Sequence, residues 1–108
     1  MRLFSFRETT SFTRRVVEYL GDESYAQLQW YLINRPEAGD LIQASGGVRK
    51  IRWAVAGRGK RGGARVIYYF APARGVFFML DVYAKGERED LTPGQLKELS
   101  GLVKEWLS

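Results

Sequence analysis

The fold is decided by residues 48–84, VRKIRWAVAGRGKRGGARVIYYFAPARGVFFMLDVYA, which contain three runs rich in β-branched and aromatic residues. The runs span Val48–Val55, Ala64–Ala71 and Val76–Ala84, and glycine-rich or Pro-Ala-Arg-Gly segments separate them. This composition is typical of strands, and strands joined by short connections usually pair with their neighbours in sequence. The stretch therefore predicts an antiparallel β-meander.

A strand and two helices are expected before this meander. Apolar residues within positions 3–6 predict a first strand, and the Thr-Thr-Ser cluster at 9–11 offers N-caps for a helix. Gly21 can end that helix, Asp22 is then expected to cap a second one, and Pro36 prevents its continuation. Such an α-hairpin must lay its apolar stripe on another element, which the sheet supplies.

A last helix is expected after the meander. Thr92 and Gln95 match a capping box, with Pro93 in its preferred first helical turn, and apolar residues then recur at helical spacing as far as Leu107. The sequence thus predicts an α+β protein in which an N-terminal strand and α-hairpin pack on a mainly antiparallel sheet with a C-terminal helix. A chain of 108 residues is expected to form a single domain, residues 1–108.

The positive charge of the chain is segregated. Residues 41–80 contain eight basic residues and no acidic one, whereas the whole chain has 17 basic and 12 acidic residues, so the remainder has a net charge of −3 (9 − 12). The eight are Arg49, Lys50, Arg52, Arg58, Lys60, Arg61, Arg65 and Arg74. Segregated charge of this kind usually persists because a polyanion or an acidic partner compensates it. We therefore expect a nucleic-acid or ribosome partner rather than a membrane.

The residue types that the chain lacks exclude several kinds of chemistry. It contains no cysteine and no histidine, so it has neither a disulfide framework nor a thiolate zinc site, and the commonest general base is missing. The carboxylates form no convincing metal constellation, and we expect no metal and no cofactor. No segment approaches the roughly 20 apolar residues of a membrane span. We expect a cytoplasmic protein.

The segment 57–62, Gly-Arg-Gly-Lys-Arg-Gly, satisfies a G-x-G-x-x-G pattern. A dinucleotide site requires a helix after the last glycine, but a predicted strand follows, and a P-loop would need Ser or Thr after Lys60. We interpret the segment as a β-hairpin loop whose glycines let Arg58, Lys60 and Arg61 approach a phosphate chain. A merely soluble cationic loop is an equally good interpretation.

Strand alternation groups the remaining cations. Lys50 and Arg52 point to one face of their strand, while Ile51 and Trp53 point to the other. Pairing across the hairpin sets Arg65 against both cations, and an anionic ligand would offset the repulsion between them. This face is the candidate site. The alternative is a solvated outer sheet face with spread-out cations.

The end of the last strand adds further candidates. Tyr83 and Lys85 fall on one face of that strand if it continues, and this end is expected near the cationic cluster. We expect Tyr83, together with Arg49 and the loop cations, to contact RNA. Asp81 lies inside the same strand, and pairing with a neighbouring arginine is the preferred explanation for it.

Several motifs, in this order of elements, resemble the HigB-type branch of the RelE/ParE toxins. They are Gly39-Asp40-Leu41-Ile42, the segments 46–52 and 59–69, and Tyr83-Ala84-Lys85-Gly86-Glu87. The resemblance spans essentially the whole chain. It implies a type II toxin, an mRNA endonuclease that acts in the ribosomal A site and is neutralised by a cognate antitoxin, through which alone the complex binds operator DNA.

The resemblance also assigns residues. The basic pair on a strand corresponds to Lys50 and Arg52, the arginine of the following strand to Arg65, and the lysine that ends the last strand to Lys85. For metal-independent cleavage we expect Arg52 and Arg65 to hold the scissile phosphate. Lys50 is then the candidate general base, and Lys85 assists the leaving oxygen. Two alternatives stay open: a ParE-like inhibitor of DNA gyrase and a non-catalytic nucleic-acid-binding module.

Overall fold

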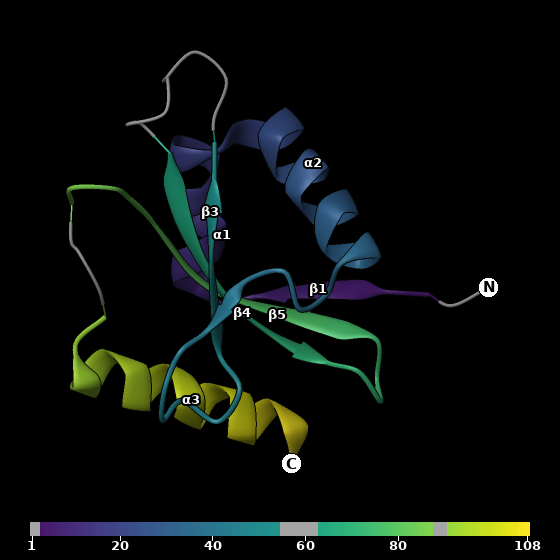
Figure 1. Ribbon diagram of the computed structural model, residues 1–108, viewed down its shortest axis with the longest axis vertical. Helices are drawn as coiled ribbons and strands as arrows, with labels where there is room; N and C mark the ends of the chain where they lie inside the picture. The colour runs from purple at the N-terminus through teal and green to yellow at the C-terminus, as the bar shows by residue number, and fades with distance from the viewer. Residues whose placement is uncertain (1–2, 55–62, 88–90) are drawn as a thin grey trace.

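The computed structural model describes residues 3–54, 63–87 and 91–108. Along the chain (Figure 1) the elements are β1 Ser5–Glu8, α1 Thr10–Tyr19, α2 Gly21–Asn34, β2 Asp40–Leu41, β3 Arg49–Trp53, β4 Ala64–Ala71, β5 Val76–Ala84 and α3 Pro93–Leu107. The strands form one sheet in the order β1-β5-β4-β3-β2. β1 runs parallel to β5, and every other neighbouring pair is antiparallel. The predicted α+β class and the mainly antiparallel sheet are confirmed.

Local sequence patterns predicted most helices and strands correctly. β4 and β5 have the predicted bounds, and Thr92 and Gln95 form the predicted capping box with Pro93 in the first turn of α3. β3 begins one residue later than predicted because the Val48 N–H donates to the Ser45 hydroxyl oxygen at 3.0 Å, while the predicted end at residue 55 lies outside the described residues.

One sequence-based expectation about the N-terminal half is wrong in detail, and one strand there was not predicted. Asp22 does not cap α2, because Leu20 closes α1 and at the same time stands at the N-cap of α2. Gly21 adopts a φ of +78°, which turns the chain directly from one helix into the next. Asp22 therefore lies in the first turn, where its charge complements the helix dipole. The two-residue strand β2 was not predicted as a strand at all.

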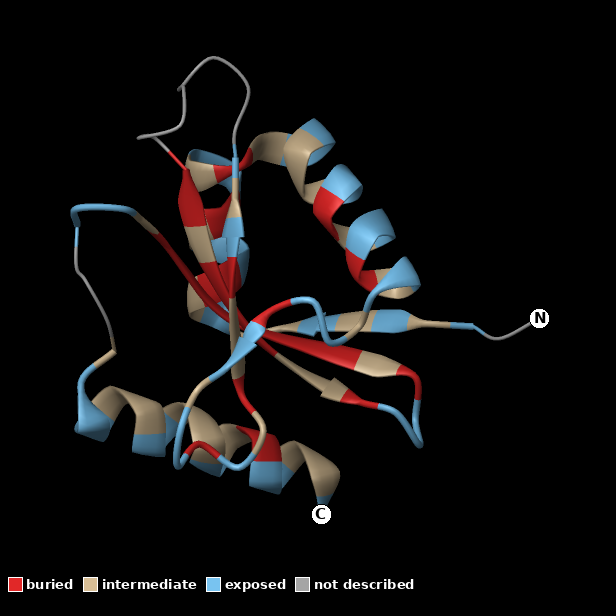
Figure 2. Ribbon diagram, viewed as in Figure 1, coloured by how far each residue is buried: buried red, intermediate tan, exposed pale blue. Residues whose placement is uncertain are grey.

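The two faces of the sheet are covered by different helices. One face packs against α1 and α2 through a cluster that includes Phe12, Leu28 and Val66. The other face packs against α3 through a second cluster that includes Ile67 and Val103. Figure 2 shows buried residues concentrated in the central strands β4 and β5. Residues of these strands point alternately to the two faces and so pack in one core cluster or the other, as expected for a pleated sheet.

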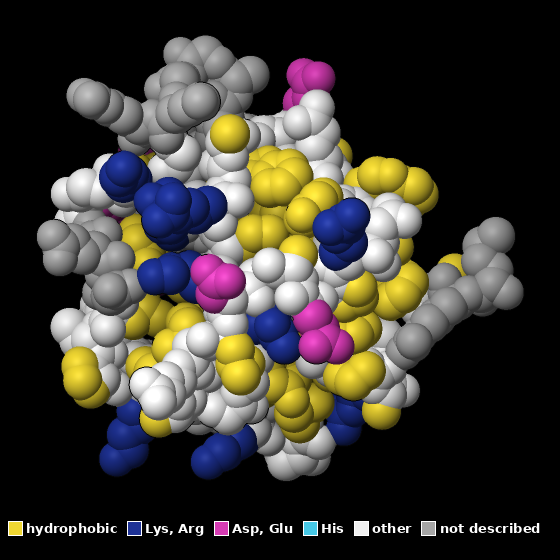
Figure 3. All heavy atoms as spheres, in the orientation of Figure 1, with side chains coloured by type: hydrophobic (Ala, Val, Ile, Leu, Met, Phe, Trp, Pro, Cys, Tyr) yellow, Lys and Arg dark blue, Asp and Glu magenta, His cyan; other side chains and the backbone are white. Residues whose placement is uncertain are grey.

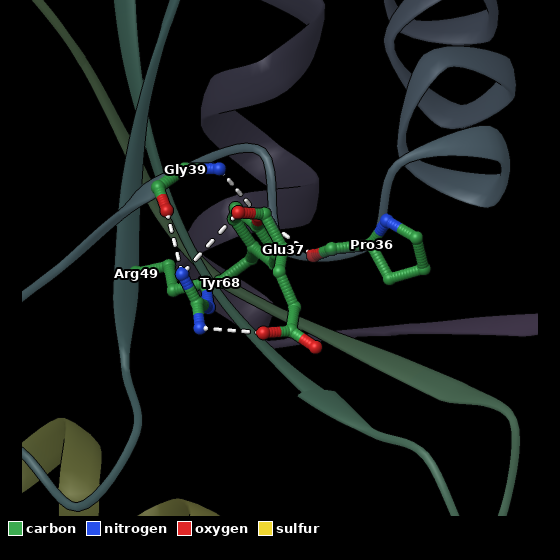
Figure 4. A network of polar contacts seen from close by, with 5 residues as sticks. All are labelled: Pro36, Glu37, Gly39, Arg49 and Tyr68. Carbon is green, nitrogen blue, oxygen red and sulfur yellow. Dashed lines mark hydrogen bonds and ion pairs between the residues drawn. The ribbon is translucent and has the colours of Figure 1, made fainter.

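A hydrogen-bond network centred on Tyr68 fixes the chain between α2 and β2 (Figure 4). Tyr68 is fully buried; its hydroxyl accepts the Gly39 N–H at 2.9 Å and donates to the Pro36 carbonyl at 2.9 Å. Burial raises the pKa of Tyr68, so the hydroxyl keeps the proton that it donates. A Cβ on Gly39 would lie 2.8 Å from the Tyr68 ring, so glycine is required for this close approach.

Replacing Tyr68 with phenylalanine should test how much this network stabilises the fold. The Tyr68→Phe variant leaves the buried Gly39 N–H without its partner, so the free energy of unfolding should fall by about 1–3 kcal/mol. The neighbouring Tyr69→Phe is the control, because within the described part of the chain the Tyr69 hydroxyl forms no hydrogen bond. Urea denaturation of both variants measures the difference, and equal losses would contradict the role of the network.

Candidate functional site

The centre of the candidate site is a direct pairing of two arginines across the sheet. Arg52 of β3 is the register partner of Arg65 of β4, and Arg65 is in turn the partner of Tyr83 of β5. Register partners of antiparallel strands have Cα atoms about 4.5–5.5 Å apart. Arg52 is exposed and Arg65 is partly exposed, and Figure 3 shows Lys and Arg side chains gathered alongside β3 and β4. Two guanidinium groups are therefore available to one anion.

Lys50 occupies the next row of the same face. It pairs with Asp40 of the edge strand β2 on one side and with the buried Ile67 on the other. Lys50 and Arg52 are two residues apart on β3, so their Cα atoms are separated by about 7 Å. Lys50 also lines a cavity of about 400 Å³ between the sheet, β2 and the start of α3. Lys50 thus lies between the Arg52–Arg65 pair and this cavity.

Lys85 extends this face beyond the last residue of β5. Its N–H donates to the Gly63 carbonyl at 3.2 Å, which continues the pairing of β5 with β4, and its side chain is exposed. Because side chains alternate along a strand, Lys85 lies on the same face as Tyr83 and its register partner Arg65. The structure therefore brings all four predicted catalytic residues to one face of the sheet.

Arg49, predicted to contact RNA, lies on the opposite face. It is the register partner of Tyr68, and its Nη1 donates to the Gly39 carbonyl at 2.8 Å. Nη2 forms an ion pair with the Glu37 carboxylate at 3.2 Å (Figure 4). The structure does not bring Arg49 to the other cations, because one residue along a strand reverses the face. Its contacts indicate that it holds the chain that leads into β2.

The other predicted RNA contacts are placed differently. Tyr83 has no exposed area; it is part of the core under α3 and lines the 400 Å³ cavity with Lys50. It lies beneath the sheet face that carries Lys50, Arg52, Arg65 and Lys85, which we call the cation face, instead of presenting its ring at the surface. Arg58, Lys60 and Arg61 lie outside the described residues.

A second charged cluster adjoins Lys85. The Glu87 carboxylate accepts hydrogen bonds from Arg15 at 2.5 Å and from the Tyr19 hydroxyl. The hydrogen bond from Tyr19 is the main cause that lowers the pKa of Glu87, and the same bond raises the pKa of Tyr19. Burial alone would lower the pKa of Arg15, but the hydrogen bond to Glu87 and the charges of Asp81 and Glu87 raise it. Arg15 and Glu87 therefore stay charged, and Tyr19 keeps its proton, as these hydrogen bonds require.

Sequence reasoning missed two carboxylates near the site. Asp40 faces Lys50, but β2 is too short to show an alternating pattern, so its partner was not predictable. The partners of Glu87 could not be predicted either, since they lie on α1, about 70 residues away in sequence. Asp81 and Arg15 line the same cavity, and the charge of Asp81 is one cause that raises the pKa of Arg15; the expected pairing of Asp81 with an arginine stays a prediction.

The described part of the chain holds no group of three or more His, Cys, Asp or Glu residues that could bind a metal ion. Within the same residues, none of the helices has the length and apolar character that crossing a membrane requires.

A family model identifies the family of this chain, and solved structures share its fold. Residues 6–108 match the family described as the RelE toxin of the RelE/RelB toxin–antitoxin system. Free E. coli RelE, as a double mutant, is similar in structure with a TM-score of 0.57 and 18% identity, covering 96% of this chain and 98% of that one. The isolated E. coli RelE toxin gives 0.55 and 19%, covering 96% and 99%. The intact E. coli RelBE toxin–antitoxin complex gives 0.55 and 20%, covering 80% and 100%.

The like-charge pair should have a measurable cost in the free protein. Arg52→Gln removes one of two facing guanidinium groups, so the free energy of unfolding should rise by about 0.2–1 kcal/mol at low salt. The gain should vanish near 1 M salt, where the Debye length is about 3 Å. Arg49→Gln is the matched control on the other face; it loses bonds to Gly39 and Glu37 and should destabilise the protein. Denaturant titrations at two salt concentrations check both, and a salt-independent loss for Arg52→Gln would contradict the pairing.

Proposed function

The chain belongs to the RelE toxin family of toxin–antitoxin systems, and on this premise we propose that it cleaves mRNA on the translating ribosome without a metal ion and so blocks translation. The observation that carries the proposal is the pairing of Arg52 with Arg65 on an accessible sheet face, beside Lys50. A phosphate-sized group of cations suits a reaction in which negative charge builds up on phosphorus oxygens.

The proposed reaction uses the RNA itself as nucleophile. The ribose 2′-oxygen loses its proton and forms a bond to phosphorus, in line with the bond from phosphorus to the leaving 5′-oxygen, which breaks. The 5′-oxygen takes up a proton. The products are a 2′,3′-cyclic phosphate and a 5′-hydroxyl, and no oxidant, water molecule or metal is consumed.

The side chains of the cation face divide these tasks. Arg52 and Arg65 hold the non-bridging phosphate oxygens through forked hydrogen bonds, since two planar guanidinium groups on neighbouring strands can approach one phosphate from adjacent directions. Lys50 accepts the 2′-hydroxyl proton, and Lys85 stabilises the leaving 5′-oxygen. The proposed contact with the RNA strand is extended by three further cations outside the described residues, Arg58, Lys60 and Arg61.

The ribosome completes the site. The chain contains no histidine, so its lysines have to carry out proton transfer, and lysine is an inefficient base at neutral pH. Alignment of the mRNA in the ribosomal A site supplies the in-line geometry, which contributes several kcal/mol to lowering the barrier. According to this proposal the protein acts in the cytoplasm, where translation occurs. Membership of the HigB-type branch stays a prediction.

A cleavage assay on translated mRNA tests the proposal. The wild-type protein should cut mRNA on programmed ribosomes rapidly and free RNA poorly, and Arg65→Ala should lower the rate by about 10²–10³-fold because one charge-stabilising donor is lost. Lys50→Ala and Arg52→Ala should each weaken cleavage. In cells, the variants that cleave mRNA more slowly should also cause weaker growth arrest.

Arg14→Ala is the control, because Arg14 is an exposed cation on α1, away from the cation face, and should leave the rate unchanged. Circular dichroism confirms that each variant is folded. A folded Arg65→Ala protein with wild-type cleavage would show that the site is misplaced. Intact transcripts together with a DNA-damage response would favour gyrase inhibition, and rapid magnesium-dependent cutting of free RNA would exclude dependence on the ribosome.

We propose further that the cognate antitoxin covers the cation face with acidic side chains and anchors itself on the α-hairpin. The solvent side of the hairpin carries exposed apolar side chains, of which Trp30 is 67% and Val17 68% exposed. Large buried aromatic residues contribute most to durable binding, whereas charge complementarity mainly speeds association. Operator DNA is bound only through the antitoxin.

The anchor can be tested by changing one residue on α2. Trp30→Glu should weaken antitoxin binding by about tenfold or more, since a central aromatic contact is replaced by a charge. Gln27→Glu, which adds the same charge to another exposed position of α2, should change binding little. Pull-down at high salt and rescue of growth by the co-expressed neighbouring reading frame measure binding. Equal effects of the two variants would place the antitoxin elsewhere.

A further inference from the structure

Glu87 connects the turn after β5 to α1, about 70 residues away in sequence. Arg15 donates to Oε1 of its carboxylate at 2.5 Å, and the Tyr19 hydroxyl donates to Oε2. Arg15 and Tyr19 are one helical turn apart, so both reach a single carboxylate, and the Arg15 guanidinium lies 5.3 Å from the centre of the Tyr19 ring. We call these three residues the Glu87 clamp.

The clamp encloses a short turn that contains Lys85. The Glu87 N–H donates to the Ala84 carbonyl at 3.1 Å and closes the turn, in which Gly86 has a φ of +93°. On the other side, the Lys85 N–H donates to the Gly63 carbonyl. Lys85 is therefore fixed at its own backbone by β4 and two residues later by α1. Without the second attachment, Lys85 would lie at the end of a strand whose pairing with β4 stops at this point in the described residues, and strand ends fray.

The attachment point on α1 is itself rigid. Phe12 and Val16, one turn before Arg15 and beside it, are 0% and 6% exposed and pack in the core under the sheet. The side chains of Arg15 and Glu87 are 24% and 38% exposed, so solvent weakens their contact only in part. The helix can thus transmit a fixed position to the turn.

We propose that Arg15, Tyr19 and Glu87 are positioning residues that hold Lys85 on the cation face. None of the three has to touch RNA, because their effect passes through the backbone of the turn. The inference rests on the proposed function in one respect: it assumes that Lys85 assists the leaving oxygen during cleavage.

Amide hydrogen exchange tests the clamp without reference to cleavage. In Glu87→Ala the Lys85 N–H should exchange about tenfold faster or more than in the wild type, while amides in the centre of β4 and β5 keep their protection. Glu37→Ala, which breaks the ion pair of Arg49 on the other face, should leave exchange at Lys85 unchanged. Unchanged exchange at Lys85 in a folded Glu87→Ala protein would overturn the proposal.

A double-mutant cycle tests whether the clamp acts through Lys85. On programmed ribosomes at saturating concentration, Glu87→Ala should lower the cleavage rate, mainly in kcat, and cause no further loss when Lys85→Ala is already present. Tyr19→Phe should reproduce a smaller part of the loss, and Glu87→Gln, whose amide oxygen can still accept the hydrogen bond from Arg15 while its NH2 group donates to the Tyr19 oxygen, should restore part of it. An equal loss in the Lys85→Ala background would overturn the proposal, because Glu87 would then act elsewhere.

The two measurements separate the inference from its premise. A wild-type protein that cuts no mRNA but shows exchange at Lys85 that depends on Glu87 would refute the proposed function and support the clamp. Normal cleavage that is insensitive to every clamp variant would support the nuclease and refute the positioning role.

Discussion

The register between β3 and β4 is the constraint on which the candidate site depends. It sets Arg52 opposite Arg65, a like-charge pair that the fold must tolerate, and it gives Lys50 and Arg49 opposite faces. A slip of one residue would turn Lys50 and Arg52 to the other face of the sheet and bring Ile51 and Trp53 to the face that the cations now occupy. The same pairing that closes the sheet therefore places two guanidinium groups opposite each other, and the repulsion between them is the cost that a bound anion would offset.

The register is secured by what the strands bury on their other sides. Ile51 and Val66 are partners and pack against the helices α1 and α2, so a shift in pairing would cost much of one core cluster. On the cation side, the core under α3 ends at Ile67 and Tyr83, and the arginines begin beyond it. The same strands therefore supply the core residues that stabilise the fold and hold the cations of the candidate site in place. Changes in the core should alter the position of the cations before they unfold the protein.

Local patterns in the sequence predicted the parts of this structure that local forces determine. Alternation and turn residues gave the bounds of β4 and β5, and the Thr92 capping box gave the start of α3. Alternation also grouped Lys50 with Arg52, and applied one residue earlier it would have moved Arg49 to the other face. Contacts between segments that are distant in sequence could not be predicted from such local patterns. The partners of Glu87 and the role of β2 depend on how helices and an edge strand dock on the sheet, which no short window of sequence records.

The parallel pairing of β1 with β5 has a consequence for the order in which the chain acquires its shape. Ser5 pairs with Val76, so the first strand to be synthesised has no partner until most of the protein has been made. Contacts between such distant residues form slowly, because a long loop must close before they contribute. α1 packs on β5 as well, and its anchoring of Glu87 comes later still. A nascent chain is therefore unable to complete the sheet, or the face that carries Lys50, Arg52, Arg65 and Lys85, before the last strand has been synthesised.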